Sequence, residues 1–160
     1  LKHTDERGFV FFTNYQSSKG LDIAHNSQVC LHFPWHFMER QIIVNGIAEK
    51  ITREDSAAYF HSRPRESQLG AWASRQSEVI ASRSVLEDDF EKLDKQFSGK
   101  EIPLPDFWGG YRIKPHTYEY WQGGAKRLHD RFRYSQSIAE FSDKPSENNQ
   151  QNWLIERLSP

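Results

Sequence analysis

Cations and hydroxyl groups recur at helical spacing in the stretch YFHSRPRES of this 160-residue chain. Tyr59, Arg63 and Ser67 lie four residues apart, so they share one face if a helix continues across Pro64. A guanidinium between two hydroxyls would suit a phosphate, because arginine presents a planar fork of donors. The alternative is a solvated helix surface with an Arg63–Glu66 pair, and spacing alone favours this plainer interpretation.

A second stretch, WQGGAKRLHDRF, gathers cations and a histidine behind two glycines. A hairpin with a glycine turn would place Arg127, His129 and Arg131 on one face of a strand. Three such groups repel one another unless an anion lies between them or solvent screens them. The pattern leaves both possibilities open.

The remaining candidates for chemistry are weaker. His32 and His36 have a metal-ligand spacing, but Pro34 between them rules out a regular helix, so no metal site is expected. Cys30 lies in an apolar run and is expected to be a core residue rather than a nucleophile. The paired glycines match no phosphate-loop pattern.

Composition narrows the class of protein. The net charge of −1 argues against a general nucleic-acid binder, and no apolar run approaches the roughly 20 residues of a membrane span. A single cysteine excludes an intrachain disulfide and suits a reducing compartment, which favours a cytoplasmic location. Because Leu1 is not an initiator methionine, we expect sequence upstream of it.

Hydrophobic alternation predicts several short strands. They cover Phe9–Thr13, Val29–Phe33 with Pro34 ending it, and Arg40–Ile51 with a bulge near Gly46. YRI and YEYWQ are expected to form two strands, and DRFRYS and NWLIERL two more.

Capping signals predict helices between these strands. The first begins at Ser17 or Ser18 and ends near His25, and the second runs from Thr52 to about His61. Pro64 opens a third, and Ser84 with Glu87 opens a fourth, whose apolar stripe consists of Leu86, Phe90, Leu93 and Phe97. The polar stretch 137–151 is expected to be a flexible loop. The fold class is therefore mainly β with peripheral helices, an antiparallel barrel with helices packed outside.

Six blocks of the sequence resemble the pyridoxamine 5′-phosphate oxidase family, in that family's order and spacing. They are FFTNYQSSKG, LHFPWHFMERQIIVNG, YFHSRPRESQLGAWASRQS, PLPDFWGGYRI, WQGGAKRLHDRF and WLIERLSP. The resemblance implies a single FMN-binding split β-barrel domain over residues 1–160, incomplete at its N-terminus, with a C-terminal strand over 152–160. It further implies a homodimer with its sites at the subunit interface.

The resemblance also implies an activity in vitamin B6 metabolism. FMN would be the cofactor for oxidation of pyridoxamine or pyridoxine 5′-phosphate to pyridoxal 5′-phosphate, with O2 as acceptor and H2O2 as product. Arg127 and His129 would be the catalytic residues. The substrate would contact Lys2, Tyr59, Arg63, Ser67, Arg127, Leu128 and His129. The cofactor would contact Lys2, Phe12, Thr13, Ser18, Lys19, Gln41, Gln76, Ser77, Trp121 and Arg131.

Two departures from the family bear on cofactor binding. Ser18 stands where the family commonly has arginine, and the family strand that ends in Lys2 lies mostly upstream of this chain. The alternative function is therefore a split-barrel protein that binds flavin or pyridoxal phosphate without turnover. A binder of single-stranded nucleic acid is the least favoured reading.

Overall fold

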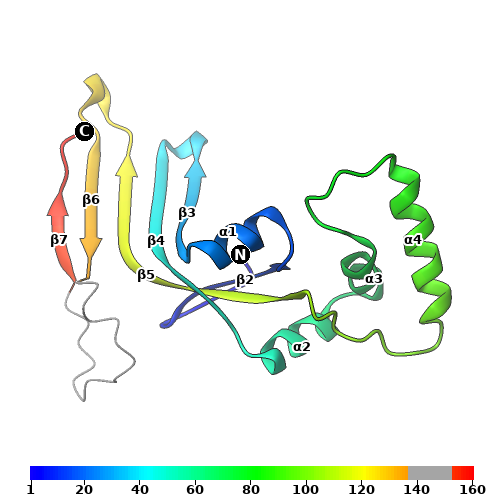
Figure 1. The fold of residues 1–160 in the computed structure, drawn as a ribbon. Helices are drawn as coiled ribbons and strands as arrows, with labels where there is room; N and C mark the ends of the chain where they lie inside the picture. Colours follow the sequence, from blue (N-terminus) through cyan, green and yellow to red (C-terminus); the bar gives the residue numbers. More distant parts are fainter. Residues whose placement is uncertain (137–152) are drawn as a thin grey trace, which may run out of the picture. The chain divides into compact units, whose positions relative to one another are not determined.

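The structure is a computed structural model that describes residues 1–136 and 153–160, so the loop expected over 137–151 lies outside the described residues. The chain divides into two compact units. Their helices and strands are labelled in Figure 1. Unit 1 comprises Leu1–Ser27 and Ala48–Arg112, and unit 2 comprises Gln28–Ile47 and Ile113–Pro160. Strands β4 (Arg40–Lys50) and β5 (Trp108–Gln122) run from one unit into the other.

The strands of unit 1 are β1 (His3–Asp5), β2 (Gly8–Asn14) and the first part of β5 (Trp108–Gln122). Strands β1 and β2 pair antiparallel, with Thr4 opposite Phe9. The strand expected over Phe9–Thr13 is confirmed. Its side chains alternate between more and less buried positions, as expected for a strand with one face on the core.

The helices of unit 1 are α1 (Ser18–His25), α2 (Arg53–Ser62), α3 (Arg65–Ala73) and α4 (Arg83–Gln96). The side chains of Ser17 and Thr52 cap α1 and α2 as expected, accepting from the backbone of Gly20 and Asp55. Within the described part of the chain, no helix has the length and apolar character needed to cross a membrane.

The expected start of α4 at Ser84 is wrong by two residues. Ser82 is the N-cap residue, and the Ser84 hydroxyl lies 2.6 Å from the Ser82 hydroxyl. Glu87 accepts instead from the Arg83 side chain at 2.7 Å. The capping-box pattern therefore marked the right region but not the residue that begins the helix.

Phe60, Leu69, Ile102 and Trp108 form the buried core of unit 1. The stripe of α4 packs against this core through Phe90, Leu93 and Phe97, as its periodicity predicted. Trp108, the first residue of β5, is the contribution of that strand to this core.

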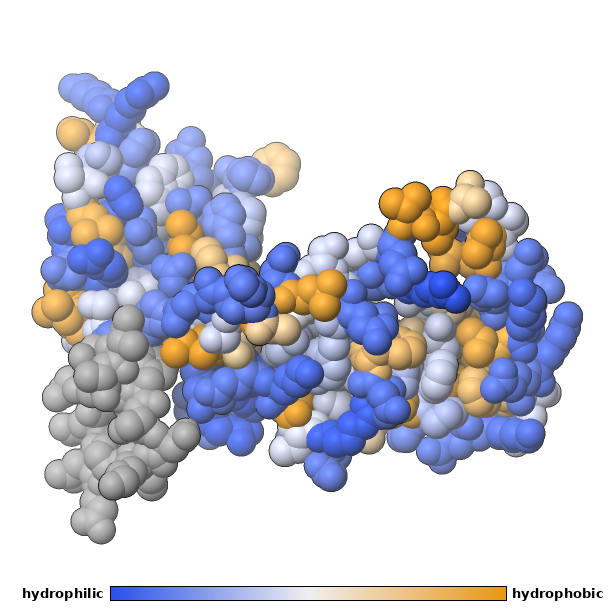
Figure 2. Space-filling model, in the orientation of Figure 1, coloured by the Kyte–Doolittle hydropathy of each residue, from blue (hydrophilic) through white to orange (hydrophobic). Residues whose placement is uncertain are grey.

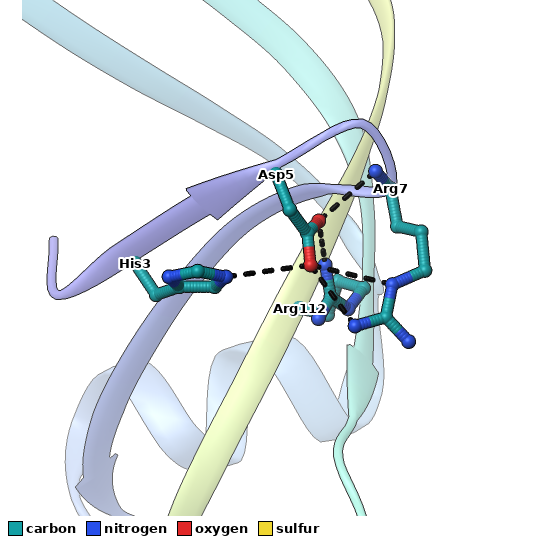
Figure 3. A network of polar contacts seen from close by, with 4 residues as sticks. All are labelled: His3, Asp5, Arg7 and Arg112. Carbon is teal, nitrogen blue, oxygen red and sulfur yellow. Dashed lines mark hydrogen bonds and ion pairs between the residues drawn. The ribbon is translucent and has the colours of Figure 1, made fainter.

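The Asp5 carboxylate anchors β1 to its neighbours through a polar network (Figure 3). It accepts from the Arg7 guanidinium at 2.9 Å, pairs with Arg112 of β5 and lies 3.4 Å from His3. The Asp5 and Arg112 side chains are each only 14% exposed. The hydrogen bond from Arg112 lowers the pKa of Asp5 well below its usual range, so β1 is held by a charged group that stays ionised.

Unit 2 contains the strands β3 (Gln28–Trp35), β4 (Arg40–Lys50), β6 (Asp130–Ser135) and β7 (Leu154–Arg157), together with most of β5. A 3-10 turn over His36–Met38 joins β3 to β4, and a second over Ala125–Arg127 precedes β6. The order of hydrogen-bonded strands is β1-β2-β5-β4-β3, with β6 between β5 and β7.

Three sequence expectations about these strands are wrong. Pro34 does not end β3 but pairs with Gln41, because β3 is the last strand in the order of described strands and an edge tolerates a missing N–H. The β3–β4 register runs through Gly46 without a bulge. Gly46 is instead needed because a Cβ there would collide with the Lys114 carbonyl on β5. YRI and YEYWQ belong to one 15-residue strand.

Cys30 is also misplaced by the sequence reasoning, since it is exposed rather than in the core. It lies on the edge strand β3, which has a neighbour on one side only among the described strands.

The segment between α3 and α4 leaves apolar side chains at the surface. Figure 2 shows hydrophobic surface gathered near the start of α4. Val79 is fully exposed, and Ile80 and Val85 are partly so. The same segment contains Gln76 and Ser77, two of the expected cofactor contacts.

Candidate functional site

Three of the expected cofactor residues meet in unit 1. Thr13 lies near the end of β2, Lys19 in the first turn of α1 and Gln76 just after α3. The Lys19 ammonium donates to Thr13 Oγ1 and to Gln76 Oε1, each at 2.8 Å, and Thr13 Oγ1 donates to Gln76 Oε1 at 2.9 Å. An ammonium has three donors, so one remains for an anion at this cluster.

Three other expected contacts of unit 1 lie at exposed positions. Ser18 is the first residue of α1, and Lys2 precedes β1, where its backbone N–H donates to Val10 at 2.9 Å. Ser77 has a left-handed backbone with φ of 74°. That conformation is uncommon for a residue with a side chain, and it turns the chain directly after Gln76.

An aromatic stack carries the expected phosphate-binding residues. The Phe12 and Tyr59 rings are stacked with centroids 3.9 Å apart, and Phe12 also stacks on Trp108 at 5.5 Å. The Arg63 guanidinium lies over the Trp108 ring, 4.9 Å from its centroid. Trp108 therefore supports Arg63 as well as belonging to the core, a contact that the sequence pattern did not predict.

Arg63 carries a buried donor with no acceptor. Among side chains of the described residues, its Nη1 is the one buried nitrogen or oxygen without a hydrogen-bond partner. Burial lowers the pKa of the Arg63 guanidinium. The alternative pairing with Glu66 is absent from the contacts of the described residues. A buried donor without an acceptor is costly, so this nitrogen marks a place for an anion.

The helix does not continue from Tyr59 to Ser67. Helix α2 ends at Ser62, and Arg63 is extended with φ of −79° and ψ of 151°. The cause is Pro64, whose ring disfavours a helical residue before it. Ser67 lies in α3, where its backbone N–H donates to Pro64 at 2.9 Å.

In unit 2 the residues before β6 form a turn rather than a strand. Lys126 and Arg127 have φ of 58° and 63°, and β6 begins only at Asp130. The expected strand face with Arg127, His129 and Arg131 is therefore wrong, because a strand places no residue in the left-handed region. Arg127 is exposed, and Leu128 is 72% exposed.

His129 is held by the glycine turn. The Gly124 backbone N–H donates to His129 Nδ1 at 3.1 Å, and the Trp121 ring lies 4.9 Å from the imidazole. A neutral His129 with Nδ1 as acceptor carries its proton on Nε2. The turn thus fixes which nitrogen of the imidazole can donate.

Arg131 is already paired within unit 2. Its guanidinium contacts Glu119 Oε1 at 2.9 Å and 2.7 Å and donates to the Ser159 carbonyl at 2.9 Å. Arg131 lies opposite Trp121 in the β5–β6 register. Glu119 was missed by sequence reasoning, although its position two residues before Trp121 puts it on the same face of β5.

Gln41 contacts a histidine from the neighbouring strand. His32 Nε2 lies 3.0 Å from Gln41 Oε1. Sequence reasoning considered His32 only as a metal ligand and missed this pair, which depends on the β3–β4 register.

The expected site residues are divided between the two units. Unit 1 holds Lys2, Phe12, Thr13, Ser18, Lys19, Tyr59, Arg63, Ser67, Gln76 and Ser77. Unit 2 holds Gln41, Trp121, Arg127, Leu128, His129 and Arg131.

The described strands form a mainly antiparallel sheet, and the cationic and aromatic groups described above are of the kinds that bind anionic, ring-containing ligands. Two family models match the chain. Residues 1–97 match the one described as pyridoxamine 5′-phosphate oxidase, and residues 108–160 match the pyridoxine 5′-phosphate oxidase C-terminal dimerisation region. The chain belongs to the pyridoxamine 5′-phosphate oxidase family, as its sequence blocks predicted.

Curated relatives match over the full length of the chain. One from Teredinibacter turnerae is 56% identical over 160 residues, and one from Vibrio vulnificus is 51% identical. Both are named pyridoxine/pyridoxamine 5′-phosphate oxidase, and the chain covers 70% of each of them.

Solved structures support the fold class. PhzG from Burkholderia lata, solved with tetrahydrophenazine-1-carboxylic acid, has a TM-score of 0.83 at 25% identity, covering 99% of this chain and 72% of its own. A pyridoxamine 5′-phosphate oxidase-related, FMN-binding protein from Nostoc punctiforme has a TM-score of 0.64 at 14% identity, covering 94% and 71%. The expected split-barrel class with peripheral helices is confirmed.

Proposed function

We propose that this chain is an FMN-dependent oxidase that converts pyridoxamine or pyridoxine 5′-phosphate to pyridoxal 5′-phosphate. Family membership and the names of the relatives support this activity. Oxidation of the alcohol removes two electrons and two protons, which O2 takes up to become H2O2. The amine substrate also takes up water and releases ammonia.

The observation that carries the proposal is the unpaired Nη1 of Arg63. A substrate phosphate would supply the missing acceptor through a charge-assisted hydrogen bond. We assign Tyr59, Ser67 and Lys2 to the same phosphate. Tyr59 stacks with Phe12, and Phe12 stacks on Trp108, the ring over which Arg63 lies. These rings would give the flat substrate ring an apolar surface beside the group that binds its phosphate.

The polar cluster of unit 1 fits the phosphate-bearing cofactor. Lys19 has a donor left over, and Thr13 and Gln76 hold its ammonium in place. We assign Phe12, Ser18 and Ser77 to the same cofactor. When bound, FMN supplies the group that accepts the electrons of the substrate. The chain's own task is to hold the two ligands in a productive geometry.

The groups of unit 2 orient the rings. His129 presents a donor at Nε2, because Gly124 occupies its Nδ1. Arg127 is exposed, and its guanidinium makes no hydrogen bond or ion pair with the described residues, so it is available to the pyridine substituents. We assign Arg127 and His129 to catalysis, with Leu128 between them against the substrate. Gln41, Trp121 and Arg131 are assigned to the flavin.

We further propose that two copies of the chain complete each site. The match of residues 108–160 to a dimerisation region supports a homodimer. The phosphate-binding groups belong to unit 1 and the orienting groups to unit 2. In a two-fold dimer, unit 1 of one copy and unit 2 of the other would form each of two identical sites.

The test is to purify the chain with FMN, record its flavin spectrum and add pyridoxine 5′-phosphate. We expect bound flavin and release of H2O2 equal to the pyridoxal 5′-phosphate formed. Bound flavin with no peroxide under the same conditions would instead identify a flavin-binding protein without turnover. Absence of flavin binding would overturn both.

A further inference from the structure

We propose that His32 is a positioning residue that sets which end of the Gln41 amide faces the cofactor. This inference rests on the assignment of Gln41 to the flavin edge. It concerns a second residue, on a different strand, that would touch neither substrate nor cofactor.

The β3–β4 register places the two side chains together. His32 is opposite Ile43, and Pro34 is opposite Gln41. Opposite residues in an antiparallel pair project to the same side of the sheet, so His32 and Gln41 are diagonal neighbours on one face. Their side chains meet, with 3.0 Å between His32 Nε2 and Gln41 Oε1.

In the structure Gln41 Oε1, not Nε2, faces His32 Nε2. Because an amide oxygen only accepts hydrogen bonds, we infer the His32 tautomer that carries its proton on Nε2 and donates it. That tautomer holds the amide in this orientation, because the reverse orientation would place the Gln41 NH2 group against the N–H of His32. Elsewhere among the described residues, Gln41 Nε2 has no recorded partner. The NH2 group is therefore the end left for a ligand.

This orientation selects the chemistry of the ligand edge. An NH2 group donates to carbonyl oxygens and to unprotonated ring nitrogens, both of which the flavin ring edge carries. It does not match the ring N–H, which would need Oε1. Donation to the ring also favours the electron-rich reduced form, so His32 indirectly raises the reduction potential of the cofactor.

The experiment compares three variants in the full chain. His32→Leu removes the donor, and His32→Gln keeps an N–H donor at similar reach. Cys30→Val is the matched control, because Cys30 lies two residues away on the same strand face and is exposed. The measurements are the side-chain amide NMR signals of Gln41 without flavin, the dissociation constant for FMN and the flavin reduction potential.

We expect His32→Leu to shift the Gln41 amide signals in the flavin-free protein. The dissociation constant for FMN should rise about threefold to tenfold, since one oriented hydrogen bond is at stake. The reduction potential should fall. In His32→Gln, the FMN dissociation constant and the reduction potential should both lie close to those of the unmodified protein. Cys30→Val should leave all three measurements unchanged.

A further variant, Gln41→Leu, distinguishes the positioning role of His32 from the assignment of Gln41 to the flavin. If Gln41→Leu weakens flavin binding and His32→Leu does not, the positioning role of His32 is wrong. If neither substitution changes flavin binding or potential while the protein still turns over, the assignment of Gln41 to the flavin is wrong, and the positioning role falls with it.

Discussion

The two units prepare their polar groups for ligands in different ways. In unit 1, Arg63 is fixed by packing on Trp108 but has a buried nitrogen with no acceptor. In unit 2, Arg131 and His129 already have partners in the protein. Arg63 of unit 1 therefore has a buried donor left unsatisfied, whereas the internal hydrogen bonds of Arg131 and His129 in unit 2 fix the orientation of those two side chains.

This difference suggests a division of labour between affinity and geometry. An uncompensated cation gains most from an anion, so groups like Arg63 should govern how tightly phosphate esters bind. Groups whose rings and amides are already oriented should govern how well the bound rings react. The following substitutions test that division.

The largest effect is expected for Arg127→Ala in unit 2. Loss of its guanidinium should lower kcat about 100-fold, because the ring would lose an orienting contact. Flavin content should stay near that of the unmodified protein. Lys126→Ala is the matched control, since Lys126 shares the same turn and left-handed backbone. An equal loss of turnover and flavin in Arg127→Ala would contradict the proposed separation of roles.

Arg63→Met should act on affinity instead. The KM for pyridoxine 5′-phosphate should rise about 10- to 100-fold with the loss of charge-assisted hydrogen bonds. The Tm of the ligand-free protein should stay the same or rise, because a buried donor without an acceptor is removed.

Arg65→Met provides the contrast to Arg63→Met two residues away. Arg65 donates to Asp94 Oδ1 at 3.1 Å and to the Phe97 carbonyl at 3.0 Å, so it holds the end of α4. Its loss should lower the Tm and leave KM unchanged. A fall in Tm for Arg63→Met with no change in KM would mean that Arg63 is structural.

Lys19→Met should weaken FMN binding about 10-fold, since one ammonium contact to the cofactor phosphate would be lost. Fluorescence titration of the flavin-free protein measures this constant. Lys50→Met serves as the control, because Lys50 lies over the Tyr15 ring at 4.2 Å and has no assigned ligand. Equal weakening by both substitutions would point to a general charge effect.

The smallest effect on ligands is expected for Asp5→Asn, which acts on folding. Because the folded state lowers the pKa of Asp5, its contribution to stability is full above the unfolded pKa of about 4 and declines as pH falls below it. Asp5→Asn should therefore lower the Tm at pH 7, with the difference shrinking below pH 4. A Tm difference that stays constant between pH 7 and pH 3 would contradict this.

Local patterns in the sequence predicted much of the secondary structure. Ser17 and Thr52 cap the helices where their side-chain chemistry indicated, and the stripe on α4 packs on the core. The family motifs predicted a shared ligand for Lys19 and Gln76, and these side chains, 57 positions apart in sequence, are hydrogen-bonded in the structure.

The pairing register between distant strands and the left-handed backbone conformations could not be predicted from local sequence patterns. Glu119 and His32 act through cross-strand neighbours, and those depend on pairings that one strand alone does not encode. The turn at Arg127 was wrongly predicted to be a strand, because ionisable residues at every second position resemble the two-residue alternation of a β-strand. Its left-handed backbone is set by the surrounding fold rather than by local propensity.

Mixing two impaired variants, assayed at a pyridoxine 5′-phosphate concentration well below the raised KM of Arg63→Met, tests the central claim most directly. Arg63→Met removes a unit 1 group and Arg127→Ala a unit 2 group, so a mixed dimer would have one intact site and one doubly altered site. After dissociation and random reassociation of equal amounts, peroxide formation should recover to roughly one quarter of the unmodified rate. If mixed dimers form but their rate at this substrate concentration stays at the level of the two parents, unit 1 of one copy and unit 2 of the other do not build one site.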